Sequence, residues 1–341
     1  SPGDIILIDN GTYYENIIIN KSIILRGKDW PIIDGNGTGS AITILGNGTE
    51  IEGLAIRNSR DSPFQGIRIQ SNDNVIMNNI IFDCNLGLDI QNAYNNTIRA
   101  NDINNNSIGL NFSQSSFCQA EHNIIIDNDM GIALWRSDNN SLGMNNFSSN
   151  QQGLVIIQSH YNNLSNNTAS FNSENGISMK DSNNNDINHS MVNYNKKNGL
   201  VLQRSNFNKI VSNNLGYNAQ NGLSLEGSCN NSIKNNDASN STNSYGINVK
   251  SKSNDNVLND NFISDSYQQG LIISQSFNNT IKNNSISNNK NGGIRLFRSE
   301  YCLISENRLH KNTAYGIQLD ESGNSNITNN SASNNPIGIS L

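Results

Sequence analysis

The chain has 341 residues, of which 34% are hydrophobic and 15% charged, and its formal net charge is −6 at pH 7. This acidic balance, with no cluster of Lys or Arg, argues against a nucleic-acid partner. The apolar runs are of the scale of NIIIN and SIILR, too short for a membrane-spanning helix, so we expect no membrane span.

The first 60 residues contain short alternating apolar segments separated by Gly and Asn, as in PGDIILIDNGTYYENIIINKSIILRGKDWPIIDGNG. Such alternation predicts short β-strands joined by tight turns. We expect residues 1–60 to form the leading or capping coils of a repeat structure. Residues 61–341 are then its regular part, and the whole is one continuous domain.

From residue 66 onward, a glycine followed by apolar residues at its first and third positions recurs thirteen times, every 21–24 residues. The glycines are Gly66, Gly87, Gly109, Gly131, Gly153, Gly176, Gly199, Gly222, Gly246, Gly270, Gly293, Gly316 and Gly338. Two further apolar columns follow eleven and sixteen residues after each glycine, as at Ile187 and Val192. Three strands per coil of about 22–24 residues predict an all-β, right-handed parallel β-helix, with the hand expected from strand-crossover chirality.

Asparagine returns to fixed places between these strands, as at Asn185, Asn208 and Asn231. Its amide both donates and accepts, so identical residues on successive coils can bond along the stack. Asparagine also tolerates the left-handed backbone of a tight corner. The pattern therefore predicts asparagine ladders at the corners, with aliphatic columns between them.

A stripe of charged residues lies on the expected outward face, and it contains Lys180, Asp181, Arg204, Glu226 and Lys250. Mixed charges of this kind can grip uronic acids or supply a catalytic acid and base. Asp181 and Glu226 are two coils apart, about 10 Å, slightly beyond the separation of about 6.5–9.5 Å in inverting glycosidases. The alternative is a solvated face with cross-strand ion pairs.

Aromatic residues flank this stripe: Trp135 and Phe297, with Arg136 and Arg298 beside them, are the candidates for substrate binding because exposed rings can stack on sugars. The same face also carries the apolar residues Val155, Ile157, Val201 and Ile272. These indicate contact with a loop, another domain or another copy of the chain. Self-association through the exposed sheet face or the open helix ends is therefore one expected partner interaction.

The four cysteines and four histidines show no spacing typical of a disulfide framework or a metal site. We expect no metal and no cofactor, with calcium left open. Eighteen Asn-x-Ser/Thr sequons favour a glycoprotein that is secreted or at the cell surface, whose signal sequence is not in this chain.

The opening segment and repeats such as GISMKDSNNNDI and GLSLEGSCNNSI resemble the NosD-like, CASH-type β-helix family over essentially the whole chain. The resemblance implies the β-helix fold and three classes of function: polysaccharide-acting enzymes, surface proteins, and a periplasmic factor for copper-site assembly. The histidines and methionines form no cluster that matches the copper role. The Gly-His-Gly run of polygalacturonases and the Asp-Pro-His-Asp run of alginate epimerases are missing from the sequence.

The first hypothesis is an extracellular or cell-surface β-helix protein, structural or adhesin-like, that binds a polysaccharide or cell-surface glycan. The alternative is a polysaccharide lyase or glycoside hydrolase for an acidic extracellular polysaccharide, using Asp181, Arg204 and Glu226. A periplasmic NosD-like metallocofactor-assembly protein is the second alternative.

Overall fold

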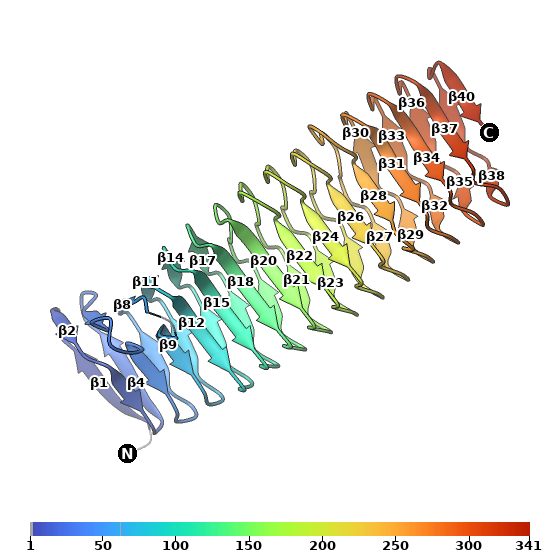
Figure 1. Cartoon of the computed structure of the whole chain (residues 1–341). Coiled ribbons are helices and arrows are strands. Elements are labelled where there is room, and N and C mark those ends of the chain that lie inside the picture. Colours follow the sequence, from blue (N-terminus) through green and yellow to red (C-terminus); the bar gives the residue numbers. More distant parts are fainter. Residues whose placement is uncertain (1–2, 62) are drawn as a thin grey trace. The chain divides into compact units, whose positions relative to one another are not determined.

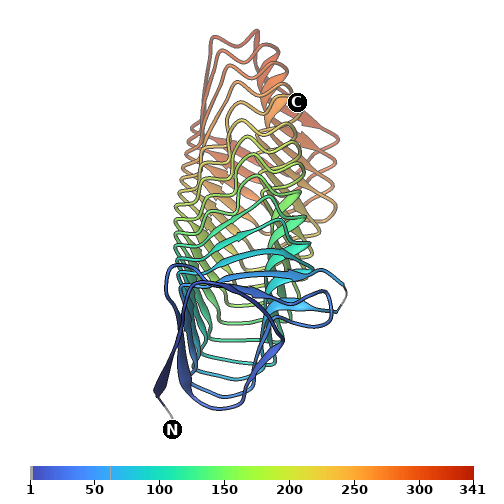
Figure 2. The same cartoon turned by 90° about the vertical axis from the view of Figure 1, so that its left-hand side faces the viewer.

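The computed structural model describes residues 3–61 and 63–341, and these divide into two compact units, Ser1–Thr168 and Ala169–Leu341. Within each unit the chain winds through three parallel β-sheets, A, B and C (Figure 1). The coils from β19 to β28 have strands in sheets A and C, with isolated bridges such as Asn146–Thr168 and Met191–Asn214 in the place of sheet B. In the N-terminal unit, Figure 2 shows the coils stacked one behind another.

In the N-terminal unit, the strands of each sheet pair in parallel with those of the next coil. Sheet A contains β1 (Asp4–Ile8), β4 (Ile23–Gly27), β7 (Glu50–Glu52), β10 (Val75–Met77), β13 (Thr97–Arg99), β16 (Gln119–Glu121), β19 (Ser141–Gly143) and β21 (Asn163–Ser165). Sheet B contains β2 (Thr12–Tyr14), β5 (Ile32–Asp34), β8 (Ala55–Ser59), β11 (Ile80–Cys84), β14 (Asp102–Asn104) and β17 (Ile124–Ile126). Sheet C contains β3 (Ile17–Ile19), β6 (Ile42–Ile44), β9 (Gln65–Ile69), β12 (Leu86–Gln91), β15 (Ile108–Ser113), β18 (Met130–Trp135) and β20 (Gln152–Ile157).

The C-terminal unit repeats the arrangement. Its sheet A contains β23 (Asp186–Asn188), β25 (Lys209–Val211), β27 (Ser232–Lys234), β29 (Val257–Asn259), β32 (Thr280–Lys282), β35 (Leu303–Ser305) and β38 (Asn326–Thr328). Its sheet B contains β30 (Phe262–Ser264), β33 (Ser285–Ser287), β36 (Arg308–His310) and β39 (Ser331–Ser333). Its sheet C contains β22 (Ile177–Lys180), β24 (Leu200–Gln203), β26 (Leu223–Glu226), β28 (Ile247–Lys250), β31 (Gln269–Ser274), β34 (Gly292–Phe297), β37 (Tyr315–Asp320) and β40 (Ile337–Ser340).

The leading coils join the regular ones in the same stack, since β7 pairs with β10, β8 with β11 and β6 with β9. These pairings connect the first 60 residues to later coils within the N-terminal unit. The division into leading coils over 1–60 and one continuous domain over 61–341 remains a prediction.

The aliphatic columns predicted from the sequence fill the interior. Ile187, Ile210 and Ile233 are each 0% exposed, and they pair in register between neighbouring coils. A single coil cannot bury such a face, but stacking covers it on both sides. The predicted β-helix, with three strands per coil, is confirmed.

The asparagine ladders are also confirmed. The Oδ1 of Asn208 accepts from the backbone N–H of Asn185 at 2.8 Å and from its Nδ2 at 3.2 Å. The Oδ1 of Asn231 accepts in the same way from Asn208, at 2.8 and 3.1 Å. Each ladder amide therefore satisfies a buried backbone donor that the turn leaves without a sheet partner.

The left-handed backbone lies one residue earlier than predicted. Positive φ belongs to Asn184 (57°), Phe207 (58°) and Asn230 (56°), the residues before the three ladder asparagines. That residue turns the chain, and the following asparagine then points inward toward the next coil. The ladder position selects asparagine for its amide, while the corner accepts residues as large as Phe207.

Candidate functional site

The outer face of sheet C is the broadest strand surface in the N-terminal unit, and its central column is unexpectedly buried. Side chains alternate along each strand, so that Leu88 and Ile90 of β12 face the core while Asp89 faces outward. Outward residues in the same central column are Arg68 on β9, Asp89 on β12 and Asn111 on β15, which are register partners. Asp89 is 0% exposed even though it does not belong to the hydrophobic interior.

A continuous hydrogen-bond network joins these residues. Asp89 Oδ1 accepts from Asn111 Nδ2 at 2.7 Å, and Asp89 Oδ2 accepts from Gln91 Nε2 at 2.5 Å. Gln91 Oε1 in turn accepts from Arg68 Nε at 3.2 Å and from Arg68 Nη2 at 3.0 Å. The buried carboxyl thereby fixes the half-exposed Gln91, and Gln91 fixes the half-exposed guanidinium.

Burial raises the pKa of Asp89 above its ordinary value, and the hydrogen bonds from Asn111 and Gln91 and the charge of Arg68 oppose that rise. Asn111 Oδ1, close by, is buried and has no hydrogen-bond partner among the described residues. A protonated Asp89 could donate its O–H to this oxygen if the amide of Asn111 were turned over, because the two ends of an amide are nearly indistinguishable. Burial favours the neutral carboxyl, whereas the hydrogen bonds that Asn111 and Gln91 donate favour the anion.

The charge of Arg68 is not neutralised by a direct ion pair: no Asp or Glu of the described residues lies within salt-bridge distance of it. By contrast, Arg57 contacts Asp34 at 2.9 Å and Arg60 contacts Asp83 at 2.6 Å. A guanidinium held by a neutral amide keeps its attraction for an external anion.

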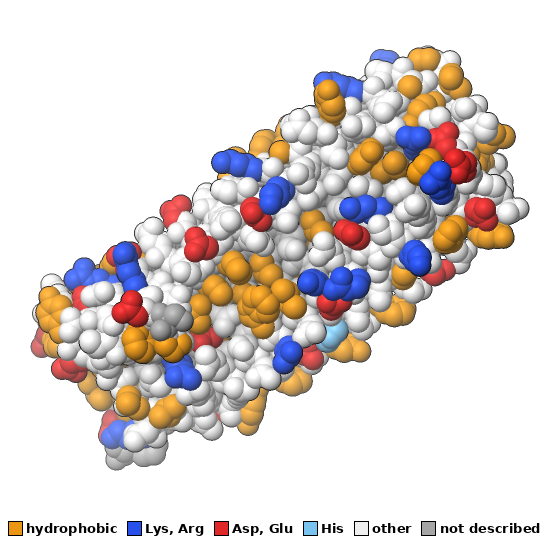
Figure 3. All heavy atoms as spheres, viewed as in Figure 1, with side chains coloured by type: hydrophobic (Ala, Val, Ile, Leu, Met, Phe, Trp, Pro, Cys, Tyr) orange, Lys and Arg blue, Asp and Glu red, His pale blue; other side chains and the backbone are white. Residues whose placement is uncertain are grey.

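An apolar shelf continues the same face along the next strands, β18 and β20. Trp135 and Ile157 are register partners and half-exposed, whereas Ala133 and Val155 lie in the central column at 0% and 7% exposure. Figure 3 shows apolar side chains gathered over these two strands. The N-terminal unit thus presents a charged, hydrogen-bonding area and an aromatic area side by side on one sheet face.

The charged stripe predicted from the sequence lies in the C-terminal unit, where charges of both signs stand side by side (Figure 3). Arg204 holds Asp181 through two hydrogen bonds of 2.7 Å, Nε to Oδ1 and Nη2 to Oδ2. Lys250 Nζ lies 3.5 Å from Glu226 Oε2. The bond from Arg204 holds the pKa of Asp181 below its ordinary value, so this carboxyl is an anion at neutral pH and a poor proton donor.

Lys180 ends β22 with an exposed side chain beside this stripe. Phe297 is half-exposed and receives Arg298 over its ring at 4.9 Å, while Arg298 Nε also donates to Glu321 at 2.8 Å. In the N-terminal unit, Arg136 Nε donates to Gln158 at 3.0 Å. The catalytic and substrate-binding roles given to these residues remain predictions, and the observed pairs also fit the alternative of a solvated face.

The sequence hypothesis passed over Asp89 because it considered positions four and five after each glycine, and Asp89 stands at position two. Position two is occupied by Ala133, Val155, Val201 and Ile272 in other coils, and the last three are only 7–8% exposed. These apolar residues were expected to be free for contacts, but their neighbours on the same face already cover most of their surface. An acidic residue in this column was the one sequence signal of the polar network.

Within residues 3–61 and 63–341, no three His, Cys, Asp or Glu side chains gather where they could hold a metal ion. The described part of the chain also forms no helix able to cross a bilayer.

The sequence matches two models of known protein families. The family model described as right handed beta helix region matches residues 4–151 and 203–341. The chain belongs to the right-handed β-helix family. Residues 107–244 also match the model described as periplasmic copper-binding protein (NosD), which confirms the NosD-like resemblance. A comparison with curated proteins finds no match to this β-helix chain.

Solved structures share the fold at low sequence identity. The A-module of the mannuronan C-5 epimerase AlgE4 from Azotobacter vinelandii is 14% identical, with a TM-score of 0.57 over 99% of this chain and 89% of that one. The periplasmic alginate epimerase AlgG is 12% identical, with a TM-score of 0.57 over 92% of this chain and 77% of that one. At such identity the likeness establishes the β-helix architecture alone.

Proposed function

We propose that this β-helix protein binds an acidic polysaccharide outside the cytoplasm, along the outer face of sheet C in its N-terminal unit. The observation that carries the proposal is that one sheet face holds both Arg68, which has no ion-pair partner among the described residues, and the half-exposed Trp135, three strands further along sheet C. Arg68 would attract a sugar carboxylate, and Trp135 would stack on a sugar ring. Successive coils lie about 4.8 Å apart, so an extended polymer can contact several strands at once.

The comparisons add support of a general kind. Two of the solved structures with this fold are named as a mannuronan epimerase and an alginate epimerase, and the second of these, like the NosD family, is described as periplasmic. An extracellular or periplasmic protein whose partner is a glycan agrees with both.

Binding to immobilised alginate, polygalacturonate and a neutral glucan tests the proposal. The parent protein should bind at least one acidic polymer more tightly than the glucan, and added salt should weaken that binding. Arg68→Ala and Trp135→Ala should each reduce affinity about tenfold. Phe117→Ala, which removes a more exposed ring (62%) at a corner of the same unit, is the control. Equal affinity of Arg68→Ala and the parent would contradict the proposal.

Asp89 favours a second candidate function, a lyase or hydrolase acting on the same acidic polymer. A carboxyl with a raised pKa can donate its proton to the glycosidic oxygen as the C–O bond breaks; in a hydrolase a water molecule bonds to the anomeric carbon and loses a proton, and in a lyase the C5 proton is lost to a base as the C4–C5 double bond forms. Gln91 covers Asp89 and would have to move aside for contact. Incubation with acidic polysaccharides, followed by assays for reducing ends and unsaturated uronates, tests this function: Asp89→Asn should abolish product. If Asp181→Asn or Glu226→Gln abolishes it instead, the stripe of the C-terminal unit carries the chemistry.

A further inference from the structure

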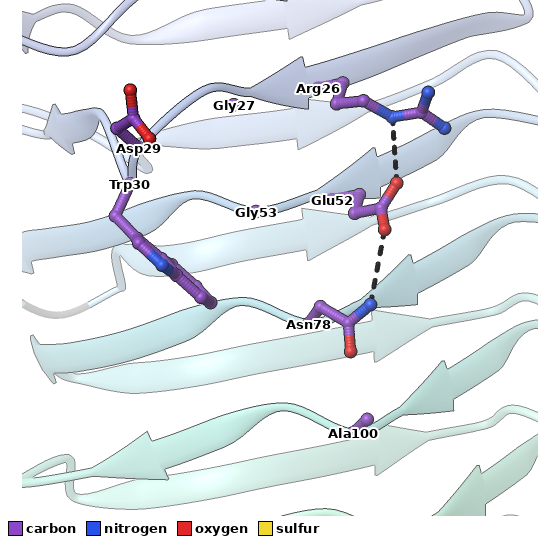
Figure 4. A pocket seen from close by; sticks show the side chains of 8 residues that line it. All are labelled: Arg26, Gly27, Asp29, Trp30, Glu52, Gly53, Asn78 and Ala100. Atoms are coloured by element: carbon purple, nitrogen blue, oxygen red, sulfur yellow. Dashed lines mark hydrogen bonds and ion pairs between the residues drawn. The ribbon is translucent and has the colours of Figure 1, made fainter.

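A pocket of about 650 Å³ lies at the corner between sheets A and B of the N-terminal unit, away from the strands of sheet C. Figure 4 shows its two walls: the indole of Trp30 on one side and a line of Arg26, Glu52 and Asn78 on the other. The backbone of Gly27 and Gly53 lies between them.

An enlarged corner creates the aromatic wall. Residues 28–31 connect β4 to β5, whereas only residues 53 and 54 connect β7 to β8 in the next coil. Asp29 and Trp30 both adopt positive φ, 61° and 60°, which swings the loop outward. The indole reaches past Gly53 to the level of Asn78, and Trp30 remains 48% exposed (Figure 4). A tryptophan face held open in this way is available for stacking.

The opposite wall alternates donors and acceptors on successive coils. Arg26 Nε donates to Glu52 Oε2 at 2.9 Å, and Asn78 Nδ2 donates to Glu52 Oε1 at 3.3 Å. Arg26 and Glu52 are direct register partners on β4 and β7, so the sheet itself fixes their positions. Guanidinium, carboxylate and amide groups in one line suit hydroxyl groups, which each donate and accept.

Glycine at positions 27 and 53 leaves no side chain in the space between the two walls of the pocket. A Cβ on Gly27 would lie 2.2 Å from the carbonyl oxygen of Gly53, and Gly53 itself has a φ of +72°. The same corner in later coils is occupied by side chains, Asn78 at a φ of 52° and Ala100 at 52°. A Cβ on Gly53 would lie 3.1 Å from the carbonyl oxygen of Gly27, so a larger residue at position 53 requires a small shift of the corner and would fill the space in front of Trp30.

We propose that this pocket binds one pyranose unit of a neutral glycan, with the sugar ring on Trp30 and its hydroxyls on Arg26, Glu52 and Asn78. The charge of Arg26 is already compensated, because its Nη2 lies 3.5 Å from Glu50 in addition to its bond with Glu52. An acidic sugar would meet these two carboxylates with no uncompensated cation, which disfavours it. The proposal is independent of acidic-polymer binding on sheet C.

The chain contains two tryptophans, Trp30 and Trp135, so fluorescence can report on each alone. In a Trp135→Phe protein, titration with maltohexaose, cellohexaose and mannohexaose should give a saturable change in emission with at least one of them. A hexamer of galacturonate should give none. Glu52→Ala in the same background should weaken binding about tenfold, the effect of losing one or two hydrogen bonds.

Gly53→Asn provides the matched variant that alters shape without removing a polar group. It should abolish the emission change while the protein melts close to the parent temperature. No response to any neutral hexamer at millimolar concentration would overturn the proposal. A stronger response to the galacturonate hexamer would overturn the assignment to neutral sugars. The Trp30→Phe protein retains only Trp135, so its emission reports on the sheet C site and tests that proposal separately.

Discussion

Replacing Asn208 with alanine would test whether the ladder amides stabilise the coil stack. Asn208 is 1% exposed, and its side chain makes four hydrogen bonds: two accepted from Asn185, one donated to the Ser182 carbonyl at 3.1 Å and one donated to Asn231 Oδ1 at 3.1 Å. Truncation removes all four and takes the acceptor from the buried backbone N–H of Asn185. An orphaned buried donor and several lost hydrogen bonds together should lower the free energy of unfolding by about 3–6 kcal/mol.

The loss can be measured by urea unfolding followed by far-UV circular dichroism. Lys209→Ala is the control, since Lys209 is the exposed neighbour of Asn208 at the start of β25. That variant should stay within about 0.5 kcal/mol of the parent. If Asn208→Ala loses less than about 1 kcal/mol relative to Lys209→Ala, the amides fill the corners without contributing appreciably to stability.

Three further predictions concern buried groups. Ionisation of Asp89 destabilises the fold as pH rises from the ordinary pKa of 3.8 through the raised pKa of the folded protein, and it has no effect below 3.8. Asp89→Asn should therefore raise the melting temperature at neutral pH and lose that gain in acid. A gain that does not depend on pH would contradict the assignment. Burial raises the pKa of Cys84 to about 12, so a thiol reagent should modify the more accessible Cys229 first and Cys84 only on unfolding; rapid native labelling of Cys84 would refute this. A Cβ on Gly199 would lie 2.5 Å from a ladder amide, whereas a Cβ on Gly323 would meet nothing within 4 Å. In urea unfolding, Gly199→Ala should lower the free energy of unfolding by about 1–3 kcal/mol and Gly323→Ala by much less. Equal losses would show that close packing is not the reason for the glycine column.

The interior of the fold could be predicted because every coil meets the same constraint. The aliphatic residue at Ile210 must match those at Ile187 and Ile233, and the amide at Asn208 must meet its counterparts above and below. Such repetition appears directly as a period in the sequence. The prediction placed the residue with positive φ one position too late, because asparagine suits both the corner and the ladder. Composition alone does not separate these two requirements.

The polar network around Asp89 could not be predicted in the same way, because it occurs once. Asp89 is the only acidic residue in its column, so no period marks it, whereas Arg recurs in the column of Arg68 and Gln in the column of Gln91. Their burial also depends on the neighbouring side chains of the same face, which the alternation of a single strand does not reveal. The charged stripe around Asp181 was easier to notice, but its ion pairs are ordinary cross-strand neighbours.

The same reasoning indicates where binding sites can arise on this protein. A change at an inward position disturbs the coils on both sides, whereas an outward or corner position tolerates insertions and isolated substitutions. Both candidate sites follow this rule: the sheet C site has a buried carboxyl, Asp89, in a column that is otherwise not acidic, and the corner pocket departs from the two-residue turn at residues 28–31. The corner departure contains Trp30, and Trp135 lies two strands from Asp89 on the same sheet face. Irregularity against a repeating background is therefore the physical signal of function in this fold, and regularity is the signal of structure.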